Sequence, residues 1–138
     1  MRQKSFDIFN TKTIKFKKGN ILKTFNSTNL KFSKMKEIYF SWVNNKSVKA
    51  WKLHKKMTIH LVVPFGKVKF VILNKKDNKF KEIILGEKNY KILKIKPNTW
   101  FGFKSLSKTK SLIMNCSTLK HSKNEILRKN INQMKYKW

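Results

Sequence analysis

The sequence predicts an all-β domain, a sandwich or closed barrel of short strands, on the basis of three observations. Apolar residues recur mostly with period two, as in strands, and seldom with the 3.6-residue period of helices. The strand candidates are short and evenly spaced, with turn residues between them. The length of 138 residues fits one domain over residues 1–138, and a hydrophobic content of 40% is enough for a core.

The predicted elements follow one another as short alternating segments. Residues 11–25 alternate around the turn residues Gly19 and Asn20 and predict a hairpin. Residues 64–66 are expected to break a strand. Only the end is expected to be helical, as a short turn through Arg128, because Ser122 and Glu125 have capping-box spacing. Further strands are predicted at residues 38–43, 47–55, 59–63, 68–73, 81–85, 90–96, 100–104 and 111–117.

The charge is strongly positive. Lys and Arg number 34 against 6 acids, which gives a formal net charge of +28. Only Arg2 and Arg128 are arginines, so the field comes from lysines spread along the whole chain. One interpretation is an anionic partner, and the other is a solvated lysine surface. Nucleic-acid binders concentrate their charge and favour arginine, so a nucleic-acid partner is disfavoured, and sequence-specific readout in particular.

The remaining composition indicates a reduced protein of the cytoplasm. Cys116 is the single cysteine and lies in an apolar run, so we expect a buried structural thiol and no disulfide. No run approaches the ~18 apolar residues of a membrane span. The first residues lack the apolar region of a signal peptide, and no membrane partner is expected. The aromatic tail at residues 134–138 is expected to pack back on the barrel.

Several common site chemistries lack their motifs. The chain has no glycine-rich phosphate loop, no CxxC and no HExxH. A metal site would need His54, His60 and His121 to converge, and neither a metal nor another cofactor is expected.

The segment from Lys49 to Lys56 is the richest in possible chemistry. In a strand, Ala50, Lys52, His54 and Lys56 would share one face, with Trp51 and Leu53 on the other. Crowded cations lower the pKa of each group, so His54 would be a neutral general base beside an anion-stabilising Lys52. The alternative is a solvated polar face with one incidental histidine.

Three segments carry a resemblance to a known family: KAWKLHKKMTIHLVVPFGKVKFVILN, FKEIILGEKNYKILKIKPNTWFGFK and MNCSTLKHSKNE. In order and spacing they resemble the dTDP-4-dehydrorhamnose 3,5-epimerase family and its sugar-nucleotide isomerase relatives, over residues 12 to 130. The most specific pieces are Lys49-Ala50-Trp51 with the later His54, the strand ending in Gly66, and Pro97-x-x-Trp100-x-Gly102-Phe103.

The resemblance implies a metal-free cupin, that is, a double-stranded β-helix or jelly roll, usually a homodimer. The implied substrate is a nucleotide sugar of the dTDP-4-keto-6-deoxyhexose type, used in surface-polysaccharide biosynthesis. The implied reaction is proton abstraction next to the C4 ketone. A base removes the proton, a cation steadies the enolate, and a second group reprotonates the other face.

The sequence departs from the family at several catalytic positions. Lys52 stands where the family has its base histidine, and Phe101 replaces the histidine before Gly-Phe. The family tyrosine falls near Met114, and the active-site lysine falls near Ile59 or His60. His54 matches a second histidine seen in some relatives.

We therefore expect His54 to be the base and Lys52 its partner. Lys49 matches a phosphate-binding arginine, and Trp100 is expected either as a pocket wall or as a core residue. Further substrate contacts are expected from His60 and Lys56. Three other functions stay open: a 3,4-ketoisomerase on similar sugars, a catalytically silent cupin that binds a nucleotide sugar or other polyanion, and a nonspecific nucleic-acid binder.

Overall fold

A computed structural model describes residues 2–26 and 35–138. Its strands are β1 Phe6–Asn10, β2 Thr13–Ile14, β3 Ile21–Leu22, β4 Glu37–Asn44, β5 Val48–His54, β6 Ile59–Phe65, β7 Lys67–Asn74, β8 Lys79–Gly86, β9 Lys91–Ile95, β10 Phe101–Ser105, β11 Lys110–Ser117 and β12 Ile126–Arg128. Two single-turn 3₁₀ helices, Lys123–Glu125 and Ile131–Gln133, flank β12. The described residues contain no helix long and apolar enough to span a membrane.

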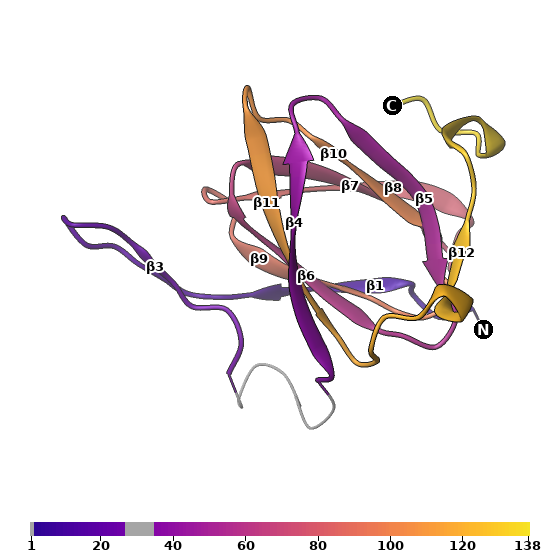
Figure 1. The fold of residues 1–138 in the computed structure, drawn as a ribbon, viewed down its shortest axis with the longest axis horizontal. Coiled ribbons are helices and arrows are strands. Elements are labelled where there is room, and N and C mark those ends of the chain that lie inside the picture. The colour runs from indigo at the N-terminus through magenta and orange to yellow at the C-terminus, as the bar shows by residue number, and fades with distance from the viewer. Residues whose placement is uncertain (1, 27–34) are drawn as a thin grey trace.

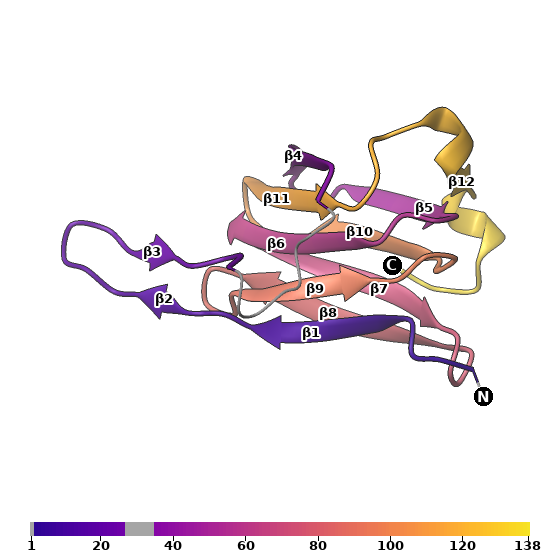
Figure 2. The same cartoon turned by 90° about the horizontal axis from the view of Figure 1, so that it is seen from below.

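The strands form two facing antiparallel sheets and one hairpin. One sheet has the order β1-β9-β6-β11-β4, and the other has the order β12-β5-β10-β7-β8. The two layers are seen edge-on in Figure 2, and the β2–β3 hairpin projects from one end of them. Neighbours in sequence such as β4 and β5 lie in different sheets, so the chain crosses between layers as a jelly roll does (Figure 1).

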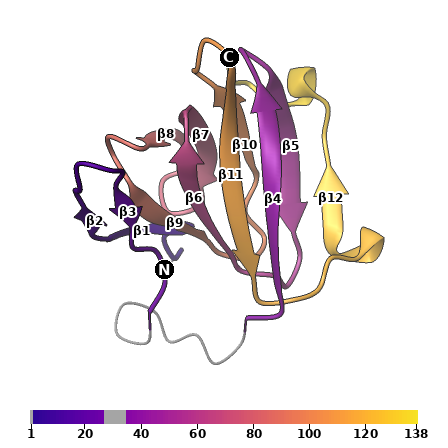
Figure 3. The same cartoon turned by 60° about the vertical axis from the view of Figure 1, so that its left-hand side comes forward.

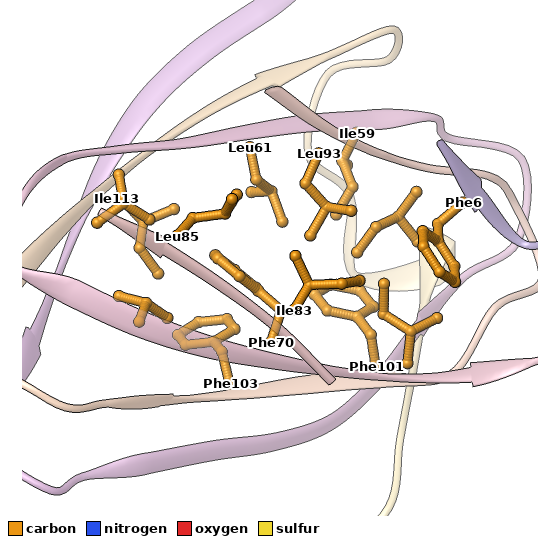
Figure 4. Packing of buried hydrophobic residues seen from close by; sticks show 14 of the residues in the cluster. Phe6, Ile59, Leu61, Phe70, Ile83, Leu85, Leu93, Phe101, Phe103 and Ile113 are labelled. Carbon is orange, nitrogen blue, oxygen red and sulfur yellow. The ribbon is translucent and has the colours of Figure 1, made fainter. Parts of the chain in front are cut away.

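The core lies between the two sheets. It is built from the alternate apolar residues of both layers, and Figure 4 shows Leu61 and Leu93 from one sheet above Phe70 and Phe103 from the other. The period-two pattern predicts these faces because every second side chain of a strand points to the same side. The prediction of an all-β cupin-type fold is confirmed.

Most predicted strands are present with boundaries shifted by one to three residues. The predicted hairpin is also present, with Gly19 at φ 134° and the Asn20 side chain accepting a hydrogen bond from the Phe16 amide. The predicted break at residues 64–66 is wrong in part, because β6 runs through Pro64 to Phe65. Pro64 is tolerated because the β6–β11 register is irregular there.

Two strands escaped prediction. β1 pairs with β9. It was not predicted because Phe6–Asn10 is a short run with no turn residues before it. Residues 126–128 were expected to be helical but form strand β12, which pairs with β5. The helical turn ends at Glu125, whose carboxylate accepts hydrogen bonds from the Lys56 and Met57 amides and so does not complete a capping box with Ser122.

The C-terminal tail packs against the outer face of the second sheet, as predicted. The indole of Trp138 lies 5.1 Å from that of Trp51, and Tyr136 contacts both rings. Phe80 on β8 completes this aromatic cluster. Cys116 is buried and unpaired, as expected, and burial raises the pKa of its thiol.

Candidate active site on the inner faces of β4, β5, β11 and β12

A bulge in β5 decides which side chains reach the inner face, the side turned toward the other sheet. On β10, Phe101 pairs with Lys52 and Phe103 pairs with Lys49, so one residue of β10 between these pairs faces two residues of β5. Paired residues share a face, and both phenylalanines belong to the core. Lys49 and Lys52 therefore both point inward.

The bulge changes the expected alternation at one position. A Cβ on Gly102 would lie 2.5 Å from the Ala50 Cβ and 2.9 Å from Trp138, on the outer face. Ala50 therefore lies with the tail and not with Lys52 and His54. Alternation alone does not predict this orientation of Ala50, because the extra residue in the bulge reverses the face of every earlier residue of β5.

His54 ends β5 as a buried imidazole with 5% exposure. Its ring stacks on Phe101, with centroids 5.9 Å apart and planes at 27°. Neither ring nitrogen has a hydrogen-bond partner among the described residues. Burial and the neighbouring Lys52 ammonium lower the pKa of His54 to about 4, so the imidazole is neutral near pH 7 with a lone pair available.

Lys52 is partly buried beside two aromatic rings. Its Nζ lies 5.9 Å from the Phe101 centroid and 5.5 Å from the Phe103 centroid. Burial lowers the pKa of Lys52 to about 8, with further lowering by the charges of Arg128 and Lys49. An ammonium that loses solvation in this way gains most from an anion placed next to it.

Tyr39 is on β4, in the opposite sheet, and the charge of Arg128 acts on it. The Asn115 amide on β11 donates a hydrogen bond of 2.8 Å to the Tyr39 hydroxyl, and the buried Asn115 Oδ1 atom has no partner within residues 2–26 and 35–138. Burial raises the pKa of Tyr39, so the phenol keeps its proton. Tyr39 was not predicted from the sequence, although the polar residues Tyr39 and Ser41, which alternate within the apolar run 38–43, are a signal for it.

Strands β4, β5 and β12 lie at the same side of the molecule (Figure 3), and two further cations belong to β5 and β12. Lys49 Nζ donates hydrogen bonds to Ser41 Oγ at 3.2 Å and to the Trp42 carbonyl at 3.0 Å. Arg128 on β12 pairs with Lys52 in register, and its charge acts on Lys52, His54 and Tyr39. Arg128 is exposed, Lys52 is partly buried and His54 is buried, so burial increases from the guanidinium to the imidazole.

The other residues expected at the site lie elsewhere. His60 is on the outer face of β6, where Nδ1 lies 3.3 Å from the Cys116 carbonyl and the ring packs edge-on against Phe25. Lys56 is exposed in the turn after β5. Trp100 directly precedes β10, and the centroid of its ring lies 4.8 Å from Lys129 Nζ. Of the residues expected from the sequence, the structure brings together Lys49, Lys52 and His54.

No group of three His, Cys, Asp or Glu side chains among residues 2–26 and 35–138 is placed to hold a metal ion. The residues around His54 are suited to acid–base chemistry. They offer one neutral base, one protonated phenol and three cations, which can bind an anionic molecule and move a proton on it.

The strand order and the packed core define the class of the chain, a cupin-type jelly roll. Residues 4–137 match the family described as FdtA: WxcM-like, C-terminal, and the chain belongs to this family. The expected resemblance is thus confirmed for the cupin class, whereas membership of the 3,5-epimerase family itself is not.

Solved structures with the same fold include a dTDP sugar isomerase from Desulfovibrio desulfuricans G20, at 29% identity and a TM-score of 0.89, covering 96% of this chain and 90% of that chain. A sugar 3,4-ketoisomerase from Thermoanaerobacterium thermosaccharolyticum, solved with TDP, has 19% identity and a TM-score of 0.76, with coverage of 94% and 90%. A dTDP-6-deoxy-D-glucose-3,5-epimerase from Legionella pneumophila has 14% identity and a TM-score of 0.74, with coverage of 89% and 77%. A search of curated proteins gave no significant match.

Proposed function

We propose that the protein is a nucleotide-sugar isomerase that moves a proton next to the C4 ketone of a dTDP-4-keto-6-deoxyhexose. The observation that carries this proposal is His54, a buried neutral imidazole with both nitrogens unpaired, next to the ammonium of Lys52. Membership of the FdtA family and the isomerases among the structural neighbours support it.

The residues fit a 3,4-ketoisomerisation. His54 takes the proton from C3, and the electron pair moves into a C3–C4 double bond, which leaves an oxyanion on O4. Lys52 stabilises this oxyanion. The O3 proton passes to O4, and His54 returns its proton to C4, so that the ketone stands at C3. The reaction changes no net oxidation state and needs one base on one face of the sugar.

The low pKa of His54 keeps the base unprotonated, and it also makes the free imidazole weakly basic. A bound diphosphate would oppose this effect, because negative charge near an imidazole raises its pKa. Lys49 and Arg128 are the cations that would hold the diphosphate near the base. Substrate binding would therefore strengthen the base that acts on it.

A single incubation tests the reaction. The protein is mixed with dTDP-4-keto-6-deoxyglucose in deuterated water and followed by NMR. We expect a 3-keto product, absent with His54→Asn and retained with His121→Asn, which changes an exposed histidine. Turnover that survives His54→Asn would remove His54 from this role. Binding of the nucleotide sugar without any proton exchange would establish the silent cupin instead.

A 3,5-epimerisation is the second candidate, and Tyr39 favours it. The Tyr39 phenol lies on the facing sheet and keeps its proton, so it could deliver a proton to the sugar face opposite His54. In the same incubation this reaction would place deuterium at C3 and C5 and leave the ketone at C4. Tyr39→Phe would then stop epimerisation, whereas a 3,4-ketoisomerisation would continue.

The expected homodimer is also a proposal. On the outer side of edge strand β4, Ile38, Phe40 and Trp42 are 49–60% exposed, and Phe65 on β6 is 46% exposed. Phe65 and Trp42 both pair in register with Leu112 of β11, so these side chains lie in adjacent rows. A strip of this kind on a monomer surface is a usual sign of an interface, here with a second copy.

A further inference from the structure

A cavity of about 740 Å³ lies outside the candidate active site. It is formed where the chain before β1, the β7–β8 loop and the end of β9 meet, and it shares no lining residue with the group of Tyr39, Lys52 and His54. Its volume is within the range of small-molecule sites.

The cavity has an unusual charge. Five cations line it, and no carboxylate does: Arg2, Lys4, Lys75, Lys94 and Lys96. Among these five, within the described residues, an ion pair is present only at Lys96, whose Nζ lies 3.7 Å from Asp7. Lys75 Nζ donates to the Pro97 carbonyl, and burial lowers the pKa of its amine. Four of the five cations therefore have no ion-pair partner among the described residues.

The floor of the cavity is fixed by buried hydrogen bonds. Ser5, at 2% exposure, donates its amide to Asn74 Oδ1 at 3.1 Å, and its hydroxyl accepts from the Lys75 amide at 2.8 Å. The Ser5 carbonyl accepts from the Lys96 amide at 3.0 Å. One buried serine thus joins the three segments that carry the cations, so their backbone positions are set before any ligand arrives.

We propose that this cavity is a second anion-binding site, for a small molecule that carries two or more linked phosphates. Convergent lysines and an arginine on a fixed floor suit a compact polyphosphate, because each phosphate oxygen can accept several charge-assisted hydrogen bonds. A diffuse lysine surface has no such convergence. The site is distinct from the diphosphate contacts proposed near His54 and does not depend on the proposed reaction.

The test uses the full chain and inorganic tripolyphosphate, with binding measured by calorimetry at about 150 mM salt to screen the general field. The double variant Lys75→Gln/Lys94→Gln removes two cations of the cavity. Lys12→Gln/Lys23→Gln removes two lysines beside the β2–β3 hairpin and changes the net charge equally. We expect affinity to fall at least about tenfold in the first variant and to change less than about twofold in the second.

Two outcomes would overturn the proposal: equal loss in both variants, or no binding by the unchanged protein. Equal loss would show that tripolyphosphate binds to the diffuse field and not to the cavity. Thermal unfolding of both variants checks the fold, and the single variant Lys94→Gln repeats the test if the double variant is unstable.

Discussion

The chemistry of the candidate site depends on how single residues lose solvent. His54, Lys52 and Tyr39 each sit where burial disfavours the charged form, so the base is deprotonated, the phenol is protonated and the ammonium is close to losing its proton. A lowered pKa suits a group to act as a base, and a raised pKa suits a group to act as an acid, so such pairs of groups indicate catalytic roles.

The depressed pKa of His54 makes stability depend on pH. Between about pH 6.5 and pH 4 the unfolded chain binds a proton at this residue and the folded chain does not, so stability falls as pH falls through this window. The contribution is at most about 3 kcal/mol. We expect His54→Asn to lose less stability than the unchanged protein between these pH values, as measured by urea unfolding. Equal losses in the two proteins would contradict the assignment.

Lys52 is expected to act as the cation beside the developing oxyanion. Lys52→Met removes the charge and retains much of the packing on Phe101 and Phe103, so kcat should fall about 100-fold or more. In the unchanged protein the rate should decline above about pH 8, where the amine loses its proton. If the rate of the Lys52→Met variant still declines above about pH 8, the decline is caused by the titration of another group.

At the scale of elements, alternation predicts the strands because one face of each is apolar. It fails where register is irregular or where pairing alone makes a strand. The faces of residues 38–43 and 90–96 could be predicted, but the bulge at Ala50 depends on the close approach of Gly102. Strand β12 exists because β5 offers a free edge, and no local pattern shows that. Arg128 could therefore not be placed at the site from the sequence.

Strand β12 should contribute to substrate binding through Arg128. We expect Arg128→Gln to raise KM about tenfold, since it removes a charge-assisted contact to phosphate, with a smaller effect on kcat. The pKa of Lys52 should rise in this variant, because the guanidinium lowers it. Lys129→Gln, one residue further on, is the matched control and should leave KM unchanged. An unaltered KM in Arg128→Gln would place the phosphates elsewhere.

On the scale of the whole molecule, a net charge of +28 opposes self-association, while the apolar strip on β4 favours it. Salt screens the repulsion and leaves the apolar term, so any dimer should strengthen as salt rises. From the sequence, the positive charge alone does not decide between an anionic partner and a solvated lysine surface. The two anion sites proposed above, one around Arg128 and one in the cavity around Ser5, would give this charge a function.

The dimer is tested at the strip itself. Trp42→Lys places a charge in the row formed with Phe65, whose ring lies 6.2 Å away, and should produce a monomer in sedimentation equilibrium. Phe16→Lys, at an exposed residue of the β2–β3 hairpin, is the control for added charge. A single mass for the unchanged protein that equals the monomer at every concentration and salt would exclude the proposal.

The aromatic tail also gives the protein an optical signature. Trp51 and Trp138 lie 5.1 Å apart with their planes at 43°, far from parallel. Two indoles held so closely at an oblique angle couple their electronic transitions and produce a paired circular-dichroism band. Because one indole is in β5 and the other in the tail, this band reports whether the tail is docked against the strand that carries Lys52 and His54, and it does so without any added dye.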